Sequence, residues 1–211
     1  MATDVQPEAQ GAAERILEAA CELIAADGID GVRIARVANR AGASTALVHH
    51  YFSTRDELLE QALVHSFEQA GDERFQRGDH DETATRALAR GIAQCLPFGG
   101  PQEREWVLWV ELWLRAVREP DLRPVAARLY SRYRDWMAGL IRAGAESGEF
   151  PADIDPGRLA DTAMALLDGA GVRALIRDPG MDVEGAHRLV AERLATELGL
   201  ESGALLLEAP G

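Results

Sequence analysis

Apolar residues recur along most of this chain at intervals of three and four, which is the spacing of one face of an α-helix. No segment combines β-branched residues with strict alternation of apolar and polar side chains, so a sheet is not expected. The helical pattern is interrupted by turn-forming stretches, namely PFGGP, EPDLRP, GEFPADIDP and RDPGMD. The sequence therefore predicts an all-α fold.

Three short helices are predicted first, at about 12–26, 34–40 and 45–51. Ala41-Gly42-Ala43 forms the turn between the second and the third, and Ser44 is placed to cap the third. Thr54 to Glu57 reads as a capping box, so a long fourth helix begins there. The longer helices are expected at about 54–77, 82–96, 102–118, 122–147, 156–178 and 183–198.

Positive charge is concentrated in one short part of an acidic chain. The formal net charge is −13, yet residues 31–55 hold four arginines and no acid, so they carry +4 and the remainder carries −17. A uniformly acidic protein is a poor partner for a polyanion, whereas a local basic segment is typical of nucleic-acid contact. A chance gap in acidic residues is the alternative.

The two short helices within this segment, joined by a turn with glycine, form a helix-turn-helix pattern. The second helix has to enter a DNA groove about 12 Å wide, so its outer face cannot be bulky and acidic. Thr45, Ala46, His49 and His50 meet that requirement. The flanking arginines, including Arg36, are placed to meet phosphates, which supply most of the affinity.

The residues from about 15 to 63 resemble the TetR family of bacterial transcription regulators. The resemblance rests on AAxELIAADGIDG, VANRAGAS and HYFSTRDELL, the last of which is similar to the family signature HYFxxKxxLL. It implies that Ser44 and Thr45 begin the recognition helix near phosphates and base edges. It also implies close approach at Ala46, a backbone contact by His49 and a base or phosphate contact by His50.

The same resemblance implies that Tyr51 donates its hydroxyl group to a phosphate and that Arg55 clamps a phosphate at the start of the fourth helix. The sequence departs from the family pattern at Arg33, where a capping threonine is usual. The cap of the second predicted helix is therefore open, and Arg33 is an additional candidate for a phosphate contact.

No metal, cofactor or catalytic site is predicted. His49 and His50 diverge by about 100° on a helix and have no third ligand nearby, so they do not easily bind one ion. Cys21 and Cys95 are far apart and fit buried thiols in a reducing cytoplasm. No signal peptide or membrane span is expected, and an enzyme with an aromatic or cationic substrate remains only as a class without a supporting motif.

Pairing of two copies is expected because one recognition helix reads few base pairs, and two copies read a palindrome. The last two long helices present faces rich in small and aliphatic residues, and the resemblance implies that they form a four-helix bundle with their mates. An internal bundle helix is the alternative for each. The candidate contact residues are Ala163, Leu166, Leu167, Ala170, Ala174, Leu189, Val190 and Leu194.

Aromatic residues gather in two helices of the second half, on 106–117 and 129–140. They fit core packing or a ligand pocket that favours flat or cationic molecules. Asp168 lies on a mostly apolar side of its helix, so it needs a partner, either an arginine such as Arg115 or Arg142 or a ligand amine. The candidate ligand-binding residues are Trp106, Trp109, Trp113, Tyr133, Met137 and Asp168.

The second half resembles the BetI-like subgroup of the same family, one branch of which is associated with choline sensing. We therefore expect a ligand-responsive repressor that binds a palindromic DNA operator as a homodimer in the cytoplasm. Regulation without a small ligand and activation rather than repression are the alternatives. The expected organisation is a disordered arm (1–11), a three-helix DNA-binding domain (12–53), a ligand-binding and dimerisation domain of about six helices (54–200) and a tail (201–211).

Overall fold

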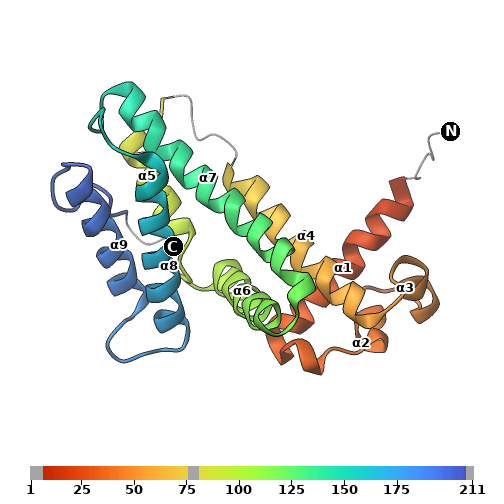
Figure 1. Ribbon diagram of the computed structural model, residues 1–211. Coiled ribbons are helices and arrows are strands. Elements are labelled where there is room, and N and C mark those ends of the chain that lie inside the picture. The colour runs from red at the N-terminus through yellow and green to blue at the C-terminus, as the bar shows by residue number, and fades with distance from the viewer. Residues whose placement is uncertain (1–6, 76–80, 208–211) are drawn as a thin grey trace. The chain divides into compact units, whose positions relative to one another are not determined.

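The computed structural model describes residues 7–75 and 81–207, and these residues are helical with connecting turns (Figure 1). The all-α expectation is thereby confirmed. The first elements are α1 (Pro7–Asp27), the 3₁₀ turn η1 (Ile29–Gly31), α2 (Ile34–Arg40), α3 (Thr45–Tyr51) and α4 (Arg55–Phe75). They are followed by α5 (Ala84–Gln94), α6 (Gly100–Arg118), η2 (Pro120–Leu122), α7 (Arg123–Ser147), α8 (Pro156–Leu175) and α9 (Val183–Glu197).

By packing, the chain divides into two compact units. Unit 1 contains residues 1–69 and 107–125, and unit 2 contains residues 70–106 and 126–211. The middle of the chain therefore contributes to both units. Unit 1 extends beyond the expected boundary between residues 53 and 54, because most of α4 and most of α6 pack with the N-terminal helices.

The core of unit 1 forms where α1, α2 and α3 pack together and where α4 and α6 add larger side chains. Phe67 of α4 stacks on Trp109 of α6 with ring centroids 4.0 Å apart. On the other side of α4, the Cys21 thiol donates a hydrogen bond to the Ala62 carbonyl oxygen at 3.1 Å. Side chains that are completely buried here are Ile16, Ile24, Val37, Val48, Leu58 and Leu63.

Unit 2 is built on helix pairs, with α8 packed along α9 and α5 packed against α9. Two glycines permit close approach of aromatic rings. A Cβ atom on Gly171 would lie 2.3 Å from Trp106, and one on Gly144 would lie 2.1 Å from Phe150. The first contact brings the ring of Trp106 on α6 against the backbone of α8, and the second folds the chain after α7 back onto that helix.

The boundaries of α2 and α3 agree with the sequence-based prediction, whereas the first helix begins earlier. Pro7 to Gly11 are helical, although they were expected in the disordered arm, and residues 1–6 lie outside the described residues. The end of the fourth predicted helix at 76–77 also lies outside them. Leu205 of the tail is fully buried, so this part of the tail packs on the protein.

Candidate DNA-binding surface and buried carboxylate

Helix α3 presents its small and polar residues to solvent. Ser44 caps it, since its hydroxyl oxygen accepts a hydrogen bond from the Leu47 amide at 3.1 Å. Val48 faces the core and is fully buried. The exposed residues include four of the predicted contact positions, namely Thr45, Ala46, His49 and His50. The outer surface of α3 is thus open and carries no acidic side chain.

The arginines of α2 are partly neutralised by acids of α1. Arg36 lies 2.6 Å from the Asp27 carboxylate, and Arg40 lies 3.3 Å from that of Glu22. These acids stand outside residues 31–55, so counting charge along the sequence did not reveal them. All four side chains are well exposed, and such pairs contribute little to stability, so phosphate groups can replace the carboxylates at small cost.

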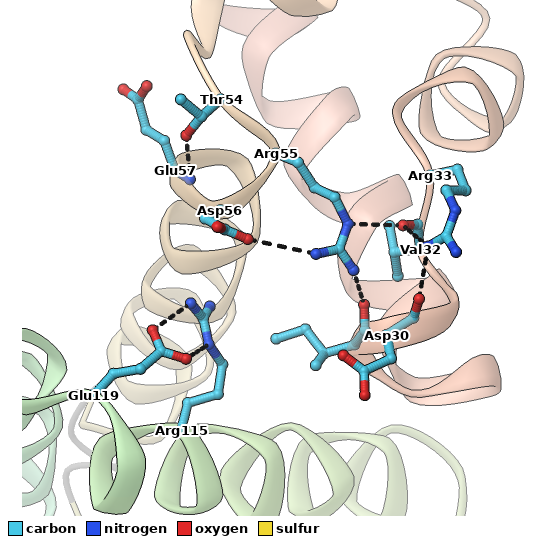
Figure 2. A network of polar contacts seen from close by, with 10 residues as sticks. Asp30, Val32, Arg33, Thr54, Arg55, Asp56, Glu57, Arg115 and Glu119 are labelled. Atoms are coloured by element: carbon cyan, nitrogen blue, oxygen red, sulfur yellow. Dashed lines mark hydrogen bonds and ion pairs between the residues drawn. The ribbon is translucent and has the colours of Figure 1, made fainter.

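Arg55 and Arg33 both bind backbone carbonyl groups of the link between α1 and α2 (Figure 2). The Arg55 guanidinium donates to the Val32 carbonyl oxygen at 2.9 Å and to that of Ile29. Arg33 donates to the Asp30 carbonyl oxygen at 2.6 Å and makes no side-chain cap for α2, as its departure from the family pattern suggested. Their expected phosphate contacts stay predictions, and each guanidinium has a role within the protein.

Tyr51, the remaining DNA-binding candidate, is partly buried at the end of α3. Its ring meets that of His50 edge to face, with centroids 5.2 Å apart. The two adjacent rings therefore pack against each other. Among the described residues, no group of three histidine, cysteine or acidic side chains is arranged to hold a metal ion.

A buried ion pair occupies the interior of unit 2. Two nitrogens of Arg74 each lie 2.5 Å from an oxygen of Glu105, and the Tyr133 hydroxyl group lies 3.1 Å from both partners. A bidentate pair of this kind is geometrically specific and satisfies both charges. Sequence reasoning did not single out Arg74 or Glu105, because they lie 31 positions apart on different helices.

Asp168 has a neutral partner, not an arginine. The Tyr130 hydroxyl group donates a hydrogen bond to its carboxylate, and no arginine pairs with it among the residues described. The two expected partners are therefore wrong: Arg115 instead pairs with Glu119 at 2.7 Å, and Arg142 is exposed. Burial raises the pKa of Asp168 above its usual range, and the hydrogen bond from Tyr130 opposes that rise.

Aromatic and sulfur-containing side chains occur in unit 2 on the same helices as Asp168 and Tyr130 and on neighbouring segments. Trp106 covers Gly171, one turn after Asp168 on α8. Met137 is fully buried, and Tyr133 lies one turn after Tyr130 on α7. Burial raises the pKa of the Cys95 thiol to about 12, and the charges of Arg74, Glu105 and Asp168 also act on it. Unit 2 thus places one carboxylate without a cationic partner in an aromatic interior.

The other two aromatic candidates belong to unit 1. Trp109 and Trp113 have ring centroids 5.9 Å apart, and Trp109 stacks on Phe67. Trp109 is a buried core side chain of that unit, and Trp113 is partly buried. Val117, one turn after Trp113 on α6, is 72% exposed.

The predicted pairing faces of α8 and α9 are split between the subunit interior and solvent. Leu166 and Ala174 are partly exposed, and Leu189 is 43% exposed. These three side chains are the members of the predicted set that a partner can reach. The members that are buried within the single chain are Ala163, Leu167, Ala170, Val190 and Leu194.

Family models match both halves of the chain. Residues 16–62 match bacterial regulatory proteins of the tetR family, and residues 84–199 match the C-terminal part of the BetI-type transcriptional repressor. The chain belongs to the TetR family. Its C-terminal part is of the BetI type, and the chain is a helix-turn-helix transcriptional regulator, as the motifs of the sequence indicated.

Relatives agree with this assignment. The HTH-type transcriptional regulator BetI of Paraburkholderia xenovorans (strain LB400) is 28% identical over 82% of this chain and 87% of its own length. A transcriptional regulator from Saccharomonospora viridis, solved in complex with choline, is 31% identical with a TM-score of 0.77, over 86% of this chain and 94% of that one. A TetR-family regulator from Rhodococcus sp. is 28% identical with the same TM-score, over 90% and 99%. None of the described helices of our chain could cross a membrane.

The raised pKa of Asp168 predicts how substitution affects stability with pH. The folded state binds the Asp168 proton more tightly than the unfolded state does. The contribution of this group to the free energy of unfolding therefore falls as pH rises from the unfolded-state pKa through the folded-state pKa. We expect Asp168→Asn to be more stable than the wild type at pH 7, with the difference vanishing well below pH ~4. Urea unfolding at both pH values measures this, and equal stability at pH 7 would contradict it.

Proposed function

We propose that this regulator is a homodimeric repressor that binds a palindromic operator and is released by a small cationic effector in the bacterial cytoplasm. The proposal for DNA is supported mainly by α3, whose outer surface is free of acids and bulky side chains while its inner residues are anchored in the core. A helix of this kind fits the major groove, and the arginines of α2 stand beside it for phosphates.

The effector class is inferred from the Asp168 site. A partly buried carboxylate with a neutral partner gains from a positive charge, because the charge offsets the loss of hydration. Aromatic rings nearby favour a cation whose charge is spread over methyl groups. The similarity to a regulator solved in complex with choline points to the same chemistry. A quaternary ammonium compound of small size is the proposed effector.

Release follows if the effector binds two conformations of the dimer unequally. One conformation holds the recognition helices at the separation of two successive major grooves, and the other does not. A ligand with equal affinity for both changes nothing, whereas a typical coupling of about 1–3 kcal/mol lowers the operator affinity roughly 5- to 150-fold. Repression requires only that the free dimer favours the DNA-competent conformation.

Operator binding is tested by selection of the purified protein against random duplex DNA, followed by affinity measurements at two salt concentrations. We expect a palindrome whose affinity falls by about 10³-fold or more between 50 and 200 mM salt, as six or more phosphate contacts require. Ala46→Glu should weaken binding by about 100-fold or more, because an acid then faces the phosphates. Ala127→Glu, an exposed position on α7, is the charge-matched control. Absence of any enriched sequence would refute operator binding.

The effector class is tested with choline and its neutral carbon isostere. We expect choline, but not the isostere, to raise the unfolding temperature and to lower operator affinity. Asp168→Asn should abolish both effects, and Glu146→Gln, which changes an exposed acid of α7, should leave them intact. An equal response to the isostere, or a full response of the Asp168→Asn variant, argues against recognition of a cation.

Pairing through α8 and α9 is tested with Leu189→Glu. A charge at this exposed position does not disturb the subunit core, but it would be buried in a dimer, where it costs several kcal/mol. We expect monomers in sedimentation experiments at a protein concentration where the wild type is dimeric. Val117→Glu on α6, which is 72% exposed, is the control. A Leu189→Glu variant that still forms dimers would exclude this face.

A further inference from the structure

The link between α1 and α2 is weakly held by its own hydrogen bonds. It consists of Gly28, η1 and Val32, and its internal bonds are long: Gly31 N to Gly28 O at 3.2 Å and Val32 N to Ile29 O at 3.4 Å. Single 3₁₀ turns have poor hydrogen-bond geometry. Because α2 begins two residues after Val32, anything that fixes this link also fixes the start of the helix-turn-helix.

Helix α6 holds the beginning of the link through Glu111. The Ile29 amide donates to the Glu111 carboxylate at 3.3 Å, so the first free N–H of η1 has a negatively charged acceptor. The same carboxylate oxygen lies against Gly28, where an added Cβ would be 3.3 Å from it. Gly28 has φ +70°, which favours glycine for this conformation in any case.

Helix α4 holds the end of the link through Arg55. Its guanidinium spans the carbonyl oxygens of Ile29 and Val32 and also lies 3.4 Å from Asp56 (Figure 2). A carboxylate thus binds the donor at the start of the turn, and a guanidinium binds one acceptor at the start and one at the end. Both contacts involve an ionised group; the Arg55 bond to Val32 is short at 2.9 Å, whereas the Ile29 bond to Glu111 is longer, at 3.3 Å.

The contact of Glu111 is polar on a side of the link that is not tightly packed. A cavity of about 220 Å³ lies there. It is lined by Glu111 and Arg55 together with Asp30, Asp56, Arg115 and Glu119. One nitrogen of Arg115 is buried without a hydrogen-bond partner, while its other nitrogens bind Glu119. The hydrogen bond from Ile29 to Glu111 therefore borders a cavity, which Leu114 of α6 and Ile29 of the link also line.

We propose that Glu111 and Arg55 are positioning residues, which clamp the link from α6 and α4 and thereby set the orientation of α2 and α3 for DNA. This clamp, formed by Glu111 and Arg55, rests on the proposed operator binding. It adds how the helix-turn-helix of α2 and α3 is oriented. A displacement of Glu111 with α6 releases the first amide of η1, and the start of α2 moves with the link. Arg55 accordingly acts through the backbone of the link and not through a phosphate.

Hydrogen exchange of the amides of residues 28–33 tests the clamp without any DNA. We expect Glu111→Ala to accelerate exchange about tenfold, which corresponds to the loss of one charge-assisted hydrogen bond. Glu111→Gln keeps an acceptor oxygen but loses the charge, so it should accelerate exchange only about threefold. Asp121→Ala removes an exposed acid from η2 and is the control with the same charge change. Unchanged exchange in Glu111→Ala overturns the clamp.

Operator affinity then tests the positioning role, using the sequence recovered by selection. We expect Glu111→Ala to weaken binding about three- to tenfold with an unchanged salt slope, since no phosphate contact is lost. Arg55→Ala should behave in the same way, and the effects of the double variant should be less than additive because both residues hold one link. Faster exchange with unchanged affinity overturns the positioning role, and a reduced salt slope in Arg55→Ala overturns the assignment of that residue.

The two readouts separate the clamp from the proposed function. If selection recovers no operator, the DNA proposal fails, while hydrogen exchange still decides whether the link is held by Glu111. Circular dichroism at rising temperature accompanies each variant. If Arg55→Ala fails to fold, the comparison of Glu111→Ala with Glu111→Gln and Asp121→Ala alone decides whether Glu111 holds the link.

Discussion

Burial of a few side chains beneath a very short helix is the constraint on which DNA recognition depends. Helix α3 has seven residues, far below the length at which a helix is stable alone in water. Its conformation comes from the Ser44 cap and from Val48, which is fully buried, with Phe52 just beyond its end. The outward residues need no stabilising role, so they are free to follow the sequence of an operator.

Local signals allowed much of the fold to be predicted. The ends of α2 and α3 depend on a glycine turn and a serine cap, which are properties of neighbouring residues, and the prediction placed them correctly. One of the two hydrogen bonds of the predicted capping box is confirmed, since the Thr54 hydroxyl oxygen accepts from the Glu57 amide. The Glu57 carboxylate accepts from the Ser53 amide and not from that of Thr54. Family and fold class are likewise confirmed by the matched models and neighbouring structures.

Contacts between distant residues could not be predicted in this way. The charge count missed that Asp27 and Glu22 lie beside Arg36 and Arg40, because helix packing brings them there. The sequence pattern likewise did not reveal that Tyr130 donates a hydrogen bond to Asp168, because a tyrosine among other aromatic residues is typical of a packed core. The candidate site residues on α3 could be predicted from local pattern and resemblance. The partners of Arg36, Arg40 and Asp168 could be found only in the tertiary structure.

The two cysteine thiols stay protonated at neutral pH. Cys21 and Cys95 are both free, and burial raises the pKa of each to about 12. Only the thiolate reacts readily with peroxides and disulfides, and at pH 7 a thiol with that pKa is ionised on the order of once in 10⁵ molecules. At neutral pH both thiols should therefore react more slowly with peroxides and disulfides than an ordinary cysteine does.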